Sequence, residues 1–117
     1  MTDSPRIYHN PRCSKSRAAL ALLQQRGVEP DIVEYLKTPP DRETLTALLR
    51  QLGIGPRELL RKGEAEYREL NLADPALSDE ALIAAMVAHP KLIERPIVVA
   101  GGQARIGRPP ERVLEIL

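Results

Sequence analysis

Residues 6–23 read RIYHNPRCSKSRAALALL. The stretch opens with a short segment of strand character, and an Asn-Pro dipeptide then breaks that segment. Ser14 or Ser16 suits the N-cap of a helix that continues through the alanine and leucine residues and stops at Gly27. The stretch therefore predicts a strand, a tight loop and a helix, and it places the only cysteine of the chain where the loop meets the helix.

The segments that follow complete an α/β pattern. Residues 31–35 read DIVEY and predict a second strand, so the first part of the chain is a βαβ unit with parallel strands. Several amphipathic helices are expected over about 41–90, and Asp41 and Ser78 suit the N-caps of two of them. A short helix is expected from Pro56 through Arg61, followed by a looser stretch to Pro75. Residues 96–100 and 103–106 then predict two strands joined by a Gly-Gly hairpin, and a last helix follows.

This order of elements, βαβ, helices, then ββα, is the layout of the thioredoxin fold. It predicts a four-stranded mixed sheet covered by helices. We expect residues 1–117 to form a single thioredoxin-like domain with a helical insertion at about 41–90. The thioredoxin fold carries its reactive cysteine after the first strand, at the start of the first helix, and Cys13 has that position in the sequence.

The composition narrows the functional class. The chain has 117 residues, 43% of them hydrophobic and 28% charged, with a net charge of +1. This balance is typical of a globular protein and gives no basic field for nucleic acid. The apolar runs are too short to span a membrane. The first ten residues, MTDSPRIYHN, lack the apolar core of a signal peptide, and a lone cysteine suits a reducing compartment, so we expect a cytoplasmic protein.

Cys13 is a candidate nucleophile. Free backbone N–H groups and the positive dipole end at a helix N-terminus favour the thiolate form of a cysteine there. The same N–H groups can bind an oxyanion, and the hydroxyls of Ser14 and Ser16 can donate further hydrogen bonds. The alternative is a small buried core residue, but the polar and cationic neighbours of Cys13 favour the functional interpretation.

Three other cysteine chemistries do not fit the sequence. The motif at residues 13–16 is C-x-x-S, so it lacks the second cysteine of a dithiol oxidoreductase. A phosphatase-type loop needs an arginine six residues after the cysteine, and Ala19 occupies that position. One cysteine and two distant histidines make no metal site.

The two histidines have different expected roles. His9 precedes the cysteine loop and is either a group that supports the Cys13 thiolate or a polar residue at the end of a strand. His89 lies next to a proline at a predicted helix end, and we expect it to be structural.

Arg61, Arg95 and Arg108 differ from the other arginines, most of which are expected to be ordinary solvated charges. The planar guanidinium gives two hydrogen bonds to a tetrahedral oxyanion, so these three are candidate substrate-binding residues. Pro96 falls where thioredoxin-like proteins carry a cis-proline that faces the active cysteine. A cis bond there would direct Arg95 toward the site.

Four blocks of the sequence resemble one family. The blocks YHNPRCSKSR, ELLRK, LIERPIVV and ARIGRPPE, in this order and spacing, are similar to the glutaredoxin-dependent arsenate reductases of the ArsC type. The resemblance covers essentially the whole chain. It is especially close to the YfgD-type branch of that family.

The resemblance implies an oxidoreductase that reduces arsenate to arsenite and has no bound cofactor. Cys13 matches the family nucleophile, and His9 matches a histidine that influences its ionisation. Arg61, Arg95 and Arg108 match the arginines that hold arsenate. Glutathione, as co-substrate, and glutaredoxin, as protein partner, supply the electrons that a single cysteine cannot.

Two other functions stay open. A thiol enzyme of the same fold could act on another substrate, such as a glutathione mixed disulfide. The Spx-type regulators share the fold and bind RNA polymerase without catalysis. Those regulators commonly carry a C-x-x-C switch, which this sequence lacks.

Overall fold

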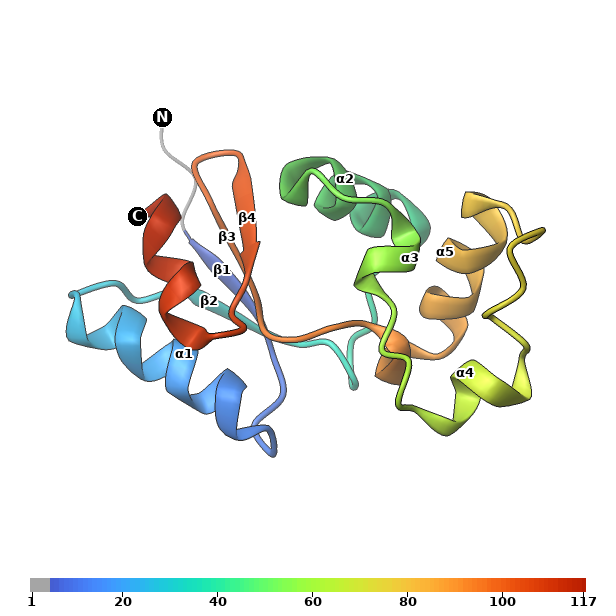
Figure 1. Ribbon diagram of the computed structural model, residues 1–117. Coiled ribbons are helices and arrows are strands. Elements are labelled where there is room, and N and C mark those ends of the chain that lie inside the picture. The colour runs from blue at the N-terminus through green and yellow to red at the C-terminus, as the bar shows by residue number, and fades with distance from the viewer. Residues whose placement is uncertain (1–4) are drawn as a thin grey trace. The chain divides into compact units, whose positions relative to one another are not determined.

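The computed structural model describes residues 5–117 (Figure 1). Residues 1–4, part of the segment inspected for a signal peptide, lie outside the described residues. The chain forms two compact units. The first comprises the residues up to Thr38 together with Arg95–Leu117, and the second is Pro39–Glu94. The description of the chain as one domain with an insertion at about 41–90 stays a prediction.

The first unit contains the whole sheet. Its elements are β1 (Arg6–His9), α1 (Ser14–Gln25), β2 (Asp31–Glu34), β3 (Ile97–Ala100), β4 (Gln103–Ile106) and the 3₁₀ helix η2 (Pro110–Ile116). The strand order is β2-β1-β3-β4, with β1 parallel to β2 and antiparallel to β3, and β3 antiparallel to β4. The predicted fold class, α/β and thioredoxin-like with a four-stranded mixed sheet, is confirmed.

One face of the sheet is covered by α1 and by η2, the red C-terminal helix in Figure 1. The side chains that meet there are fully buried, and they are Ile7, Ala19, Leu23, Val98 and Val113. Burying a side chain of valine, leucine or isoleucine size contributes about 1.5–3 kcal/mol relative to its exposed state. This small aliphatic core fixes α1, and with it the start of that helix, against the central strands.

The start of α1 differs from the prediction. The N-cap is Cys13 itself, with extended backbone angles, and no side chain caps the helix there. Neither Ser14 nor Ser16 is the N-cap, because both already lie within the helix. At the other end Gly27 has a φ of 75°, which a glycine adopts without strain, and the helix stops as predicted.

The hairpin between β3 and β4 is formed as predicted. Gly101 and Gly102 have φ values of 59° and 79°. Two central residues with positive φ match the right-handed twist of the flanking strands, and glycine is the residue that allows them.

The second unit is helical. Its elements are α2 (Arg42–Leu52), α3 (Pro56–Leu59), α4 (Ala65–Glu69), α5 (Asp79–Ala88) and the 3₁₀ helix η1 (Pro90–Leu92). The predicted N-caps are confirmed: Asp41 accepts a hydrogen bond from the Thr44 amide at 2.8 Å, and Ser78 accepts one from the Ala81 amide at 3.1 Å. The helices α2, α3 and η1 pack on α5.

Two details of this unit were predicted wrongly. The stretch before Pro75 was expected to be irregular but contains α4, which buries no residue and therefore has no apolar face to reveal it. The helix that begins at Pro56 was expected to continue to Arg61, but it ends at Leu59. Leu60 is extended and bridges to Ile93.

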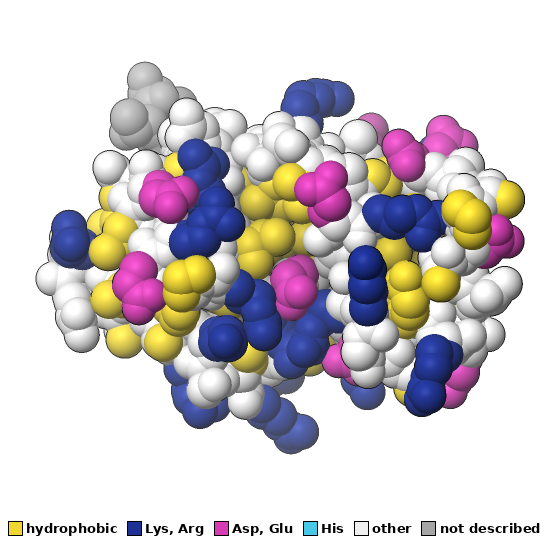
Figure 2. Space-filling model, in the orientation of Figure 1, with side chains coloured by type: hydrophobic (Ala, Val, Ile, Leu, Met, Phe, Trp, Pro, Cys, Tyr) yellow, Lys and Arg dark blue, Asp and Glu magenta, His cyan; other side chains and the backbone are white. Residues whose placement is uncertain are grey.

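The surface carries both signs of charge. Figure 2 shows Lys and Arg side chains interspersed with Asp and Glu side chains on the visible face of each unit. None of the helices within residues 5–117 is long and apolar enough to cross a membrane.

We expect Gly107→Ala to lower the free energy of unfolding by about 1–3 kcal/mol, because added atoms in a packed core force their neighbours to move. A β-carbon at residue 107 would lie 2.9 Å from Pro96 Cγ and 3.1 Å from Val113 Cγ1. Urea denaturation measures the change. Gly63→Ala is the matched control, since a β-carbon there meets nothing within 4 Å. Equal stabilities for the two variants would contradict the close packing at Gly107.

Candidate active site

The register of the sheet brings four segments to one edge. His9 at the end of β1 pairs with Glu34 at the end of β2, and Tyr8 pairs with Ile97 at the start of β3. Ile97 also pairs with Ile106 at the end of β4. The segments beyond these residues therefore leave the sheet at the same edge. They are the Cys13 loop, the turn after β2, Arg95-Pro96 and Gly107-Arg108.

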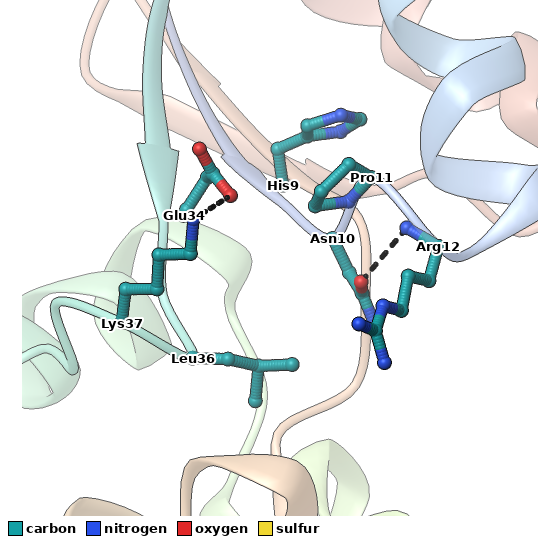
Figure 3. Close-up of a pocket in the computed structure, with 7 residues that line it drawn as sticks. All are labelled: His9, Asn10, Pro11, Arg12, Glu34, Leu36 and Lys37. Carbon is teal, nitrogen blue, oxygen red and sulfur yellow. Dashed lines mark hydrogen bonds and ion pairs between the residues drawn. The ribbon is translucent and has the colours of Figure 1, made fainter.

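Backbone turns form the Cys13 loop. The Cys13 amide donates to the Asn10 carbonyl at 3.0 Å, and the Arg12 amide donates to Asn10 Oδ1 at 3.0 Å (Figure 3). Asparagine followed by proline is favoured at the first two positions of such a turn. From the helix, Arg17 donates to the Pro11 carbonyl at 2.9 Å. The loop is thus held at its start and across its middle.

A buried polar pair joins the strand to the helix beneath this loop. His9 Nδ1 lies 2.6 Å from Ser16 Oγ, and the Asn10 amide donates to the same hydroxyl at 3.0 Å. Ser16 is fully buried and His9 is 6% exposed. The Ser16 hydroxyl is therefore engaged within the fold. This sets it apart from Ser14, which is exposed at the first position of α1.

Burial lowers the pKa of His9 from its ordinary value of 6.5, and the nearby Arg17 lowers it further. The carboxylate of Glu34 acts in the opposite direction. His9 is therefore neutral at neutral pH and offers one donor and one acceptor nitrogen. It lies directly under the loop that carries Cys13, a free and partly exposed thiol.

Arg95 and Arg108 are brought together. Arg108 Nη1 donates to the Arg95 carbonyl at 3.3 Å, and the Gly107 amide donates to the Pro96 carbonyl at 2.8 Å. The Arg95–Pro96 peptide bond is cis, and so is Arg108–Pro109. Among the residues that the structure describes, the buried Nε of Arg95 has no hydrogen-bond partner. A buried donor without an acceptor is rare in folded proteins, and an anionic ligand would satisfy it.

Arg61 belongs to the second unit, and two carboxylates hold it there. Its Nη1 lies 2.9 Å from Glu64 Oε1, and its Nε lies 3.3 Å from Glu94 Oε1. Its amide donates to the Leu92 carbonyl at 2.8 Å, so the extended segment after α3 lies beside η1. The guanidinium is largely buried and its charge is balanced.

Several residues of the site were not singled out from sequence. Asn10 shapes the loop, and the Asn-Pro dipeptide was the signal that could have identified it. Glu94 gave no local signal, because its pairing with Arg61 depends on tertiary structure. Glu64 lies three residues after Arg61, and this short spacing was the signal that could have identified it. Across residues 5–117, no group of three or more His, Cys, Asp or Glu side chains is placed to hold a metal ion.

We expect Ser16→Ala to lower the free energy of unfolding by about 1–3 kcal/mol. The change removes the partner of both His9 Nδ1 and the Asn10 amide, and buried polar groups are costly to leave unpaired. Ser14→Ala is the matched control in the same loop, and its effect is expected to stay within about 0.5 kcal/mol. Thermal or urea unfolding of the two variants measures the difference. Equal losses would contradict the structural role of the Ser16 hydroxyl.

We expect the stability of the protein to fall as the pH drops below 6.5. The lowered pKa of His9 means that the unfolded chain binds a proton before the folded chain does. The contribution of His9 to the free energy of unfolding is fully present above pH 6.5. It is lost progressively as the pH falls toward the folded-state pKa of His9. Urea unfolding between pH 7.5 and 5 measures it, with His9→Gln as the test and His89→Gln as the control. A His9→Gln variant with unchanged pH dependence would rule out this assignment.

Comparison with known proteins places this geometry in a family. The chain matches the ArsC family over residues 8–116. It is 64% identical to the uncharacterized protein YfgD of Escherichia coli K12, over 100% of this chain and 99% of the relative. It is also 48% identical to an arsenate reductase of Neisseria meningitidis serogroup A, over 96% of this chain and 97% of the relative.

A solved structure agrees with these sequences. The arsenate reductase from Vibrio cholerae superimposes with a TM-score of 0.96 and is 60% identical, over 97% of this chain and 98% of that one. Both the match over nearly the full length and the shared fold lead to one conclusion: this chain belongs to the ArsC family.

Proposed function

We propose that this protein is an arsenate reductase that uses the Cys13 thiolate, with glutathione and glutaredoxin as reductants, in the cytoplasm. The observation that carries the proposal is the match of the whole chain to proteins named arsenate reductase. The shape of the first unit supports it. Cys13 is the N-cap of α1, and the segments that contain Arg95 and Arg108 adjoin the strands at the same edge of the sheet.

In the proposed reaction, the Cys13 sulfur attacks the As(V) of arsenate. An S–As bond forms and one As–O bond breaks, and the oxygen leaves as water after taking up protons. This is nucleophilic catalysis. Arsenic stays As(V) in this step, so no electrons have yet been transferred.

The electrons come from two further thiols. A glutathione thiol replaces a second oxygen on arsenic, which again leaves as water. A glutaredoxin thiolate then attacks the glutathione sulfur. A disulfide forms between glutaredoxin and glutathione, and the bond between the glutathione sulfur and arsenic breaks. Its electron pair stays on arsenic, which becomes As(III) on Cys13. Water hydrolyses the remaining S–As bond and releases arsenite and the Cys13 thiol.

The arginines have distinct proposed roles. Arg95 binds the oxyanion with its buried Nε, which has no acceptor within the described part of the chain. Arg108 lies next to it and supports the later intermediate. Arg61 exchanges a carboxylate partner for an arsenate oxygen. All three stabilise developing negative charge, which is a large part of catalysis at oxyanions.

The groups around the thiol have supporting roles in the proposal. His9 influences the ionisation of Cys13 from beneath the loop, and Ser16 holds His9 in place. Ser14, exposed at the first position of α1, donates a hydrogen bond to the bound oxyanion.

We expect arsenate-dependent NADPH oxidation in the presence of glutathione, glutaredoxin and glutathione reductase, and we expect Cys13→Ser to abolish it. Serine keeps the size of the side chain but cannot form the S–As bond. Circular dichroism of the variant checks that the fold is kept. A wild-type protein with no arsenate-dependent rate would contradict arsenate as substrate. Rapid alkylation of Cys13 in that protein would then favour a thiol enzyme of another substrate, and an inert thiol would favour an Spx-like interaction protein.

A further inference from the structure

A pocket of about 220 Å³ lies beside the Cys13 loop, at the same edge of the sheet. Figure 3 shows its side chains in two groups. Asn10 and Arg12 come from the segment between β1 and α1, and Glu34, Leu36 and Lys37 come from the end of β2 and the turn after it. The pocket is smaller than the 300–1,000 Å³ typical of sites for whole drug-sized ligands. It therefore suits one end of a ligand.

The lining of the pocket carries charges of both signs. Arg12 and Lys37 are cations, and Glu34 is an anion. Leu36, which is 39% exposed, adds an apolar surface between them. A purely anionic or purely cationic ligand would meet repulsion from part of this set. A ligand end with one ammonium and one carboxylate group on a short aliphatic chain would match every member of it.

The existing ion pair in the pocket is weak enough to open. Lys37 Nζ lies 3.5 Å from Glu34 Oε1, and the two side chains are 78% and 40% exposed. Exposed ion pairs contribute about 0–1 kcal/mol to stability. A zwitterionic group can therefore enter between them at little energetic expense, with its ammonium on Glu34 and its carboxylate on Lys37.

The pocket lies next to the residue that carries the thiol. Arg12 lines the pocket and directly precedes Cys13, and consecutive Cα atoms are about 3.8 Å apart. A peptide whose first residue lies in the pocket has its second residue within reach of the Cys13 loop. In a γ-glutamyl-cysteinyl peptide, the first residue is the zwitterion and the second carries the thiol.

We propose that this pocket binds the γ-glutamyl end of a glutathione-type thiol peptide and so presents its cysteine to the group bound on Cys13. The inference rests on the proposed function, because that reaction requires a second thiol at Cys13. It adds the site at which that thiol is recognised. Glu34 and Lys37 become residues that determine which thiol is used, with Arg12 as a second cation for the carboxylate.

Binding of S-methylglutathione tests the proposal, since this analogue keeps both charges and cannot react. Titration followed by ¹⁵N–¹H NMR gives the Kd and locates the site. We expect amide shifts at Asn10, Arg12 and Lys37, and a Kd raised by about two- to fivefold in Glu34→Gln and in Lys37→Gln, as for the loss of one solvent-exposed ion pair. Glu80→Gln and Lys91→Gln are the matched controls, and their Kd should equal that of the wild type.

A second ligand tests which charge pairs with Glu34. N-acetylation of S-methylglutathione removes the ammonium charge. We expect the acetylated peptide to bind the wild type and Glu34→Gln with the same weakened Kd, while Lys37→Gln weakens it further. An acetylated peptide that binds the wild type as tightly as the parent would overturn the assignment of the ammonium to Glu34.

The kinetic assay separates this inference from the proposed function. With an active wild type, Lys37→Gln should raise the KM for glutathione severalfold and leave the KM for arsenate unchanged. Active variants with wild-type KM values for glutathione and wild-type Kd values would overturn the pocket and leave arsenate reduction standing. A wild type that binds S-methylglutathione in the pocket but does not reduce arsenate would support the pocket and refute the proposed function.

Discussion

The register of β1 is the constraint on which the candidate site depends. This strand is parallel to β2 and antiparallel to β3, so the end of β1, the end of β2 and the start of β3 share one edge of the sheet. The buried Ile7 holds β1 against α1 and η2. A shift of one residue would turn Ile7 away from that core. The same burial that stabilises the sheet therefore also determines which segments meet around Cys13.

Polar contacts hold the Cys13 loop, which follows β1, in one conformation. The buried hydroxyl of Ser16 contacts His9 and the Asn10 amide, and Arg17 reaches back to the Pro11 carbonyl. These bonds connect the end of a strand, the loop and the first turns of a helix. Since a buried polar group without a partner is costly, the set has one favoured arrangement. The Cys13 backbone is thereby held at the N-cap without a side-chain cap of its own.

Local sequence patterns were enough to predict most of the fold. The strands have clear β-branched or aromatic runs, and Asp41, Ser78 and the Gly-Gly hairpin act through short-range geometry that is visible in the sequence. The predictions failed where the local sequence carried no pattern that distinguishes the observed structure. The exposed helix α4 has no apolar face. Ser16 was predicted as a possible N-cap and as a donor to an oxyanion. Its contact with His9, seven residues earlier, depends on how the strand and the helix pack and is not visible in the local sequence.

Arg61 and Arg95 differ in what a bound oxyanion would change. Arg61 already has two carboxylates, so binding arsenate there replaces one charge-assisted hydrogen bond with another of similar strength. Arg95 has a buried Nε that no acceptor within residues 5–117 satisfies. Satisfying such a donor recovers about 1–3 kcal/mol. In the proposed reaction Arg95 therefore contributes more of the affinity for arsenate. Arg61 contributes through orientation, because its fork is already held in place by Glu64 and Glu94 before the oxyanion arrives.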